Sequence, residues 1–60
     1  QSSELSKSII YEKIDLIVPD KEIELIEDLK LRTGLNVNSV KVGKIDFLRD
    51  TAQVTIYYKD

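Results

Sequence analysis

Carboxylates are the most abundant side chains in this chain that could carry out chemistry. Eleven of the 60 residues are Asp or Glu, whereas Cys and His are both missing. Paired carboxylates can act as general acid and general base, and clustered carboxylates can bind Mg²⁺. Two groups stand close in sequence, namely Glu24, Glu27 and Asp28, and further along Asp46 with Asp50. The first group alternates with bases as a solvated surface does, and neither has the spacing of a calcium-binding loop, so we expect no metal site.

A nucleophile with an oriented base cannot be assembled from these residues. Without Cys and His, a Ser or Thr hydroxyl has no imidazole to activate it. The chain has only two glycines, Gly34 and Gly43, so it contains no glycine-rich phosphate loop. Acylphosphatase-type chemistry would need such a loop where the chain instead reads Ile17-Val18-Pro19-Asp20. The sequence therefore predicts a protein that is not an enzyme and needs no cofactor.

Length and charge exclude further classes of protein. A 60-residue chain forms one domain, and it buries only about 60% of the surface that its unfolded form exposes. No disulfide can add stability, so the domain depends on apolar packing or on association. Residues 1–30 have a net charge of −4 and residues 31–60 of +2. Neither half is a basic stripe, so we expect no nucleic-acid partner. No apolar run approaches the roughly 18–20 residues of a membrane helix, so we expect the chain to be soluble.

An alternating pattern predicts the first strand. Residues 1–7 are polar and without periodicity, and we expect a flexible lead-in there, followed by one domain at residues 8–59. From Ser8 to Val18, apolar residues alternate as they do in a half-buried strand. The predicted core face contains Ile10, Ile14, Leu16 and Val18, and the opposite face contains Ile9, Tyr11, Lys13 and Ile17.

Signals for a helix follow at once. Pro19 suits a first helical turn because its missing N–H would be unsatisfied there, and Asp20 can cap that end. Gly34 suits the left-handed conformation that commonly ends a helix. Between these ends, one apolar stripe is formed by Leu25, Ile26 and Leu29.

The last third of the chain predicts two strands joined by a short turn. The apolar residues at 37–47 change parity at Gly43, where a β-bulge would restore a common face. That face then contains Val40, Val42, Ile45 and Phe47. After a turn at residues 48–51, residues 52–58 alternate cleanly.

These elements predict an α+β fold of the β-α-β-β kind, which is half of a ferredoxin-like two-layer sandwich. The strand–helix–strand crossover is long enough to skip one position in the sheet. The third strand therefore lies between the first two, which gives a three-stranded sheet with the order 1-3-2. One helix covers one face of this sheet and leaves the other face bare.

The bare face and the edge of the first strand form the candidate interface. Tyrosines on a bare sheet can stack on RNA bases, but the glycine- and aromatic-rich signature of such sheets is missing and the domain is net acidic. Lysines and Gly43 protect the edge of the second strand, whereas the first strand is regular and unprotected. We expect a two-fold dimer that uses the first strand, either edge to edge or face to face. Its predicted interface residues are Ile9, Tyr11, Lys13, Ile17, Thr55 and Tyr57.

Several short stretches together carry a resemblance to a known family: Tyr11-Glu-Lys-Ile-Asp-Leu16, the Pro19-Asp20 helix start, Leu29-Lys-Leu-Arg-Thr-Gly-Leu35, Val42-Gly-Lys-Ile-Asp-Phe-Leu-Arg-Asp-Thr-Ala52 and Tyr57-Tyr58. The set covers residues 8–58 and resembles the C-terminal tail of a bacterial membrane-protein family of unknown function. The resemblance implies several N-terminal helices in the bacterial inner membrane, followed by a small cytoplasmic β-α-β-β domain. It implies no catalytic residues.

The sequence therefore predicts a non-catalytic accessory domain of a bacterial membrane protein, which serves oligomerisation or regulation. Its expected partners are further copies of itself and the N-terminal membrane region of the parent protein. The alternative is a regulatory module of the ACT or ferredoxin-like kind that binds a small ligand at a dimer interface. Binding of single-stranded RNA through Tyr11 and Tyr57 is a third class.

Overall fold

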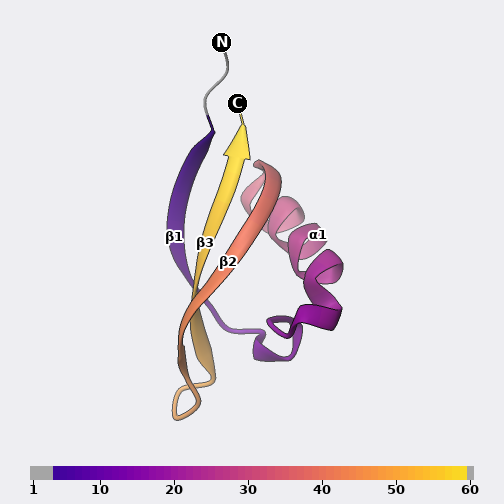
Figure 1. The fold of residues 1–60 in the computed structure, drawn as a ribbon. Helices are drawn as coiled ribbons and strands as arrows, with labels where there is room; N and C mark the ends of the chain where they lie inside the picture. The colour runs from indigo at the N-terminus through magenta and orange to yellow at the C-terminus, as the bar shows by residue number, and fades with distance from the viewer. Residues whose placement is uncertain (1–3, 60) are drawn as a thin grey trace.

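A computed structural model describes residues 4–59 and shows three antiparallel strands with one helix packed on one face of the sheet (Figure 1). The predicted fold class is confirmed, and so is the strand order β1-β3-β2 with β3 in the middle. The elements are β1 (Leu5–Tyr11), two 3₁₀ turns (Ile14–Leu16 and Pro19–Lys21), α1 (Glu22–Thr33), β2 (Asn36–Asp46) and β3 (Thr51–Lys59).

The first strand differs from its prediction at both ends. Leu5 to Lys7 belong to β1, so the predicted lead-in is wrong for these residues, while residues 1–3 lie outside the described part. β1 ends at Tyr11, and the predicted continuation to Val18 instead leaves the sheet. The two 3₁₀ turns connect the sheet to the helix layer. The residues that form this connection are therefore not part of β1.

The phase of β1 is also opposite to the prediction. Ile9 pairs with Val54 and Tyr11 pairs with Ala52, which puts the odd-numbered residues of β1 on the helix-covered face. Tyr11 is therefore buried, with 2% of its surface exposed, whereas Ile10 is 71% exposed. A shift of one residue exchanges the two faces of a strand. The prediction took its phase from residues 14–18, which are not part of the strand.

The helix follows its sequence signals closely at the C-terminal end. Gly34 has φ of 73°, the left-handed region, and its N–H donates to the Lys30 carbonyl at 2.9 Å. Leu25 and Leu29 are buried, as the stripe predicted, and Ile26 packs against the core. At the other end the prediction of an Asp20 cap is wrong, because Lys21 takes the cap position without a side-chain hydrogen bond.

A bulge in β2 lies where the glycine indicated. The pairing with β3 shifts between Val42 and Ile45, and these two residues nevertheless face Val54 and Ala52 on the same side. A second, unpredicted shift lies between Val37 and Ser39. Both shifts bend the strand, because a bulge increases the local twist.

The helix is too short to cover the whole sheet. Twelve helical residues span about 18 Å, whereas the eleven residues of β2 span about 36 Å. The turn at residues 47–50 consequently extends beyond α1 (Figure 1). Phe47, predicted in the core, is 72% exposed at this turn.

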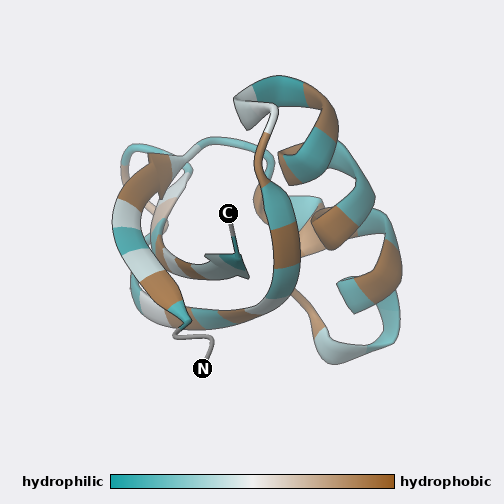
Figure 2. Cartoon of the chain, turned by 90° about the horizontal axis from the view of Figure 1, so that it is seen from above, coloured by the Kyte–Doolittle hydropathy of each residue, from teal (hydrophilic) through white to brown (hydrophobic). Residues whose placement is uncertain are grey.

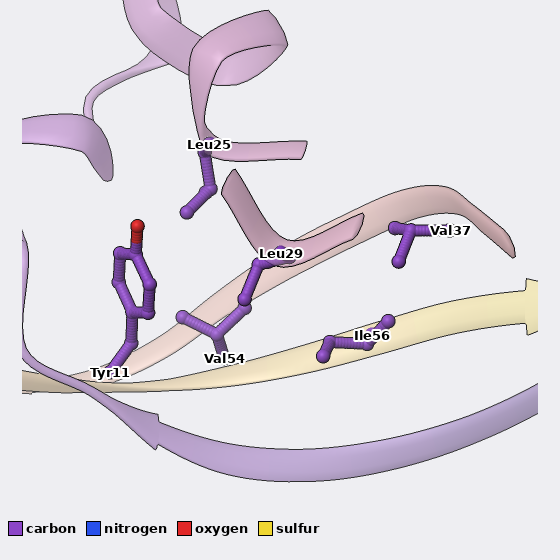
Figure 3. Close-up of a cluster of buried hydrophobic side chains, with 6 residues drawn as sticks. All are labelled: Tyr11, Leu25, Leu29, Val37, Val54 and Ile56. Atoms are coloured by element: carbon purple, nitrogen blue, oxygen red, sulfur yellow. The ribbon is translucent and has the colours of Figure 1, made fainter. Parts of the chain in front are cut away.

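The core lies between α1 and the part of the sheet away from the β2–β3 turn, which is the upper part in Figure 1. Its buried cluster consists of Tyr11, Leu25, Leu29, Val37, Val54 and Ile56 (Figure 3). Seen from above, the sheet curls and the helix lies outside the curl (Figure 2). The side chains of Glu4 and Asn38, from the two sides of β3, meet at 3.2 Å. The face without a helix is therefore concave.

Candidate functional site

A polar cluster joins the end of β1 to the helix, and its centre is Asp28. The Tyr11 hydroxyl donates to Asp28 Oδ2 at 2.5 Å, and Arg32 Nη1 donates to the same oxygen at 3.4 Å. Lys13 Nζ lies 3.6 Å from Asp28 Oδ1. Arg32 also bridges to Glu12 at 3.0 Å and lies over the Tyr11 ring, 5.7 Å from its centre. Two bases and one hydroxyl thus surround a carboxylate that is itself only 17% exposed.

These contacts fix the protonation states of the cluster. The Tyr11 hydrogen bond, with help from Arg32 and Lys13, holds the pKa of Asp28 below its usual range, although burial opposes this. Burial raises the pKa of the Tyr11 hydroxyl, and its bond to Asp28 raises it further. The pKa of Glu12 is lowered by its own backbone N–H and by Arg32. Tyr11 therefore remains a proton donor and Asp28 a charged acceptor across the neutral range.

The cluster anchors the fold and has no arrangement suited to catalysis. Asp28 is saturated by its donors, and the Tyr11 hydroxyl points from the sheet towards the helix, into the protein (Figure 3). Within residues 4–59, no three Asp or Glu side chains lie where they could hold a metal ion. Sequence analysis missed the cluster, because Tyr11 was assigned to the opposite face. The available signal was the pair Asp28 and Arg32, one helical turn apart on the face next to Leu25 and Leu29.

Replacing Asp28 with Asn should reduce the acid sensitivity of the domain. A carboxyl group whose folded pKa is depressed stabilises the fold above its unfolded pKa, and this stabilisation is lost as the pH falls through the folded pKa. Wild-type protein should therefore lose stability below about pH 4. D28N should be less stable than wild type by about 1–2 kcal/mol at neutral pH. The Tyr11 hydroxyl would then donate to a neutral amide oxygen instead of a charged carboxylate, which is a weaker hydrogen bond. The difference should shrink in acid.

Urea unfolding followed by circular dichroism, at pH values from neutral to strongly acidic, measures the free energy of unfolding of wild type and of D28N as a function of pH. Glu27→Gln is the matched control, because the pair that Glu27 forms with Lys30 is exposed and should contribute little to stability. It should leave the pH profile unchanged. Parallel profiles for wild type and D28N would show that Asp28 does not carry the acid sensitivity.

The structure separates the six residues of the predicted interface. Tyr11 and Ile9 lie on the helix-covered face, Tyr11 in the core and Ile9 packed against it, so their placement on the bare face is wrong. Ile17 also packs against the core from outside the sheet, and Lys13 pairs with Asp28. Thr55 and Tyr57 lie on the uncovered face as predicted, both half-buried.

The edge of β1, which was also part of the predicted interface, is free to pair with another strand. The sheet order leaves β1 with β3 on one side and, within residues 4–59, no strand on the other. Its pairing with β3 runs without a register shift from Leu5 to Tyr11. α1 lies over the β2 side of the sheet, so β1 is the strand furthest from the helix (Figure 1). This edge offers a regular row of backbone donors and acceptors.

Comparison with known proteins identifies the family of this chain. Residues 1–58 match the model of a family described as a domain of unknown function, DUF4956. The chain belongs to this family. The match covers the helix and all three strands except the last residue of β3. No curated protein and no solved structure matches the chain. Within residues 4–59, this DUF4956 domain contains no helix that could span a bilayer.

Proposed function

We propose that this domain is a non-catalytic association module, in which the β1 edges of two copies pair about a two-fold axis. The observation that carries the proposal is the difference between the two edges of the sheet. β1 pairs regularly with β3 over seven residues. β2 is interrupted by two register shifts and carries Lys41 and Lys44. Bulges and lysines are ordinary means of preventing edge pairing. β1 also carries a lysine, Lys7, but it has no bulge, so the regular backbone of β1 is what distinguishes the two edges.

An edge contact is favoured over a face contact by the shape of the sheet. The uncovered face is concave, and its residues on β1 and β3 are mostly small or polar: Ser6, Ser8, Gln53, Thr55 and Tyr57. A concave polar face does not fit against a copy of itself. Antiparallel pairing of two β1 strands would instead give one continuous six-stranded sheet with both helices on the same side.

The setting that we propose is the cytoplasmic side of a bacterial membrane protein, with the domain at its C-terminal end. The support is the resemblance of the motifs at residues 8–58, together with membership of a family of unknown function. In this setting, self-association of the domain would bring the membrane regions of neighbouring chains together. A domain that pairs weakly alone gains avidity from such tethering.

Lysines added to the β1 edge should prevent this association. Ser6 and Ile10 are exposed on the concave face of β1, so Ser6→Lys with Ile10→Lys should leave the fold intact. Like charges then face each other across the two-fold axis, and we expect the dissociation constant of the β1 contact to rise at least about tenfold. Sedimentation velocity over a concentration series measures it. Ser39→Lys, on the same face of β2, is the control and should have no effect.

Unchanged association of the doubly substituted variant would rule out the β1 edge as the contact. The alternative, a small-ligand module, is tested on the same samples by thermal denaturation with a panel of metabolites. A ligand that raises the melting temperature of the wild type, and not that of the dissociated variant, would place a ligand site at the dimer interface.

A further inference from the structure

Two β1 strands can pair about a two-fold axis in several registers. In each register, the residue at the axis lies directly opposite the same residue of the second copy, because a two-fold contact is self-complementary. β1 comprises the seven residues Leu5–Tyr11, and its central residue is Ser8. The axis can lie at Ser8 or at a residue on either side of it, and each choice brings different side chains together.

An axis at Ser8 uses the whole strand. Leu5 then lies opposite Tyr11 of the second copy, and Ser6 lies opposite its Ile10. An axis at Lys7 pairs only residues 5–9 of each β1 strand, and an axis at Ile9 pairs only residues 7–11. The register centred on Ser8 therefore gives partners to the largest number of backbone N–H and C=O groups of β1.

The position of Lys7 also favours this register. An axis at Lys7 would place two lysines directly opposite each other, which is destabilising. With the axis at Ser8, Lys7 lies opposite Ile9 of the second copy. Its Nζ lies 5.7 Å from the centre of the Tyr58 ring on β3, so the charge is directed over its own sheet and away from the open edge. The aliphatic part of the lysine can then lie beside Ile9.

Ser8 is suited to lie at the axis because it is small and exposed. Its Oγ accepts a hydrogen bond from Gln53 Nε2 at 3.0 Å, which holds the hydroxyl over β3. Opposite Cα atoms of an antiparallel pair lie only about 4.5–5.5 Å apart. A large or charged side chain at the axis is therefore opposed by its own copy.

We propose that two β1 strands pair with Ser8 at the two-fold axis, and that Ser8 sets the register of the contact. This inference rests on the β1 pairing proposed above and adds the residue pairs to it. The pairs are Leu5 with Tyr11, Ser6 with Ile10, Lys7 with Ile9, and Ser8 with itself.

Cysteine cross-linking tests the register directly, because the chain contains no Cys. In a glutathione redox buffer, Ser8→Cys should form a disulfide-linked homodimer, since a disulfide joins Cα atoms about 4.4–6.8 Å apart. Ser6→Cys is the matched control, an exposed serine on the same face of the same strand. Its two copies would lie about 14 Å apart along the strands and should not link. A mixture of Ser6→Cys with Ile10→Cys should give a linked heterodimer.

Opposite charges at position 8 give a second test without a covalent bond. Ser8→Asp and Ser8→Lys should each raise the dissociation constant about tenfold or more, because like charges then face each other at the axis. An equimolar mixture of the two variants should recover association as a heterodimer, which sedimentation velocity measures. The same pair of substitutions at Ser6 should show no recovery on mixing, because Ser6 lies opposite Ile10. The melting temperature of each dilute variant should stay close to that of wild type.

The outcomes separate the register from the contact itself. Linking of Ser6→Cys with Ser8→Cys would place the axis at Lys7, and linking of Ser8→Cys with Ile10→Cys would place it at Ile9. Either result, without a Ser8→Cys homodimer, would overturn the register and leave the β1 contact standing. Equal homodimer yields for Ser8→Cys and Ser6→Cys would also overturn the register. Association that neither the Ser8 variants nor the lysine-substituted β1 variant weakens would overturn the β1 contact as well.

Discussion

Leu29→Ala is expected to unfold most of this domain at room temperature. Leu29 is 1% exposed and lies in the middle of the buried cluster between α1 and the sheet. Truncating a buried leucine costs about 2–5 kcal/mol, from lost transfer energy and from the cavity that remains. A core of this size supplies about 3–5 kcal/mol in total, so one such change removes most of the margin.

Leu31→Ala is the matched control, because it makes the same change two residues further along the same helix. Leu31 is 84% exposed, so the free energy of unfolding should change by about 0.5 kcal/mol or less. Urea unfolding followed by circular dichroism compares both variants with the wild type. Equal effects at the two positions would mean that the helix packs on the sheet through a different face.

Tyr11→Ala should be about as damaging, and Tyr11→Phe should separate the two roles of this side chain. The ring packs in the core against the helix layer, and removal of a buried aromatic ring costs about 3–5 kcal/mol. The Phe variant keeps the ring and loses only the hydroxyl. It leaves Asp28 with its two basic partners, so we expect a loss of about 1–2 kcal/mol.

The comparison with Tyr57 makes this test specific. Tyr57 is half-buried on the concave face and donates no hydrogen bond to another side chain among residues 4–59, so Tyr57→Phe should be nearly neutral. Thermal unfolding of the three variants gives the ranking. Should Tyr11→Phe be as stable as wild type, the hydrogen bond to Asp28 would contribute nothing to the fold.

The features that could be predicted from the sequence are those that a few neighbouring residues determine. Gly34 allows a left-handed residue after the helix, and the parity change at Gly43 requires a bulge whatever the partner strand is. The strand order follows from connection lengths, because a short turn joins β2 to β3 and a helix joins β1 to β2. Each of these inferences needed no knowledge of distant contacts.

The phase of β1 could not be predicted in this way. Its alternation fits either face, and the choice depends on Ala52, a small residue across the sheet that pairs with Tyr11. The partner of the Tyr11 hydroxyl, Asp28, lies 17 residues away on another element. The exposure of Phe47 depends on the length of the helix relative to the strand. All three are properties of the assembled layers.

The pairing of Leu5 with Tyr58 has a consequence for how nature can use this domain. The first residue of β1 lies beside the next-to-last residue of β3, so the polypeptide enters and leaves the sheet at the same end. A domain of this kind can be carried in a surface loop of a larger host without separating the two flanking segments. It can equally be appended to one end of a host, which leaves the hairpin as the part that reaches furthest from the attachment point.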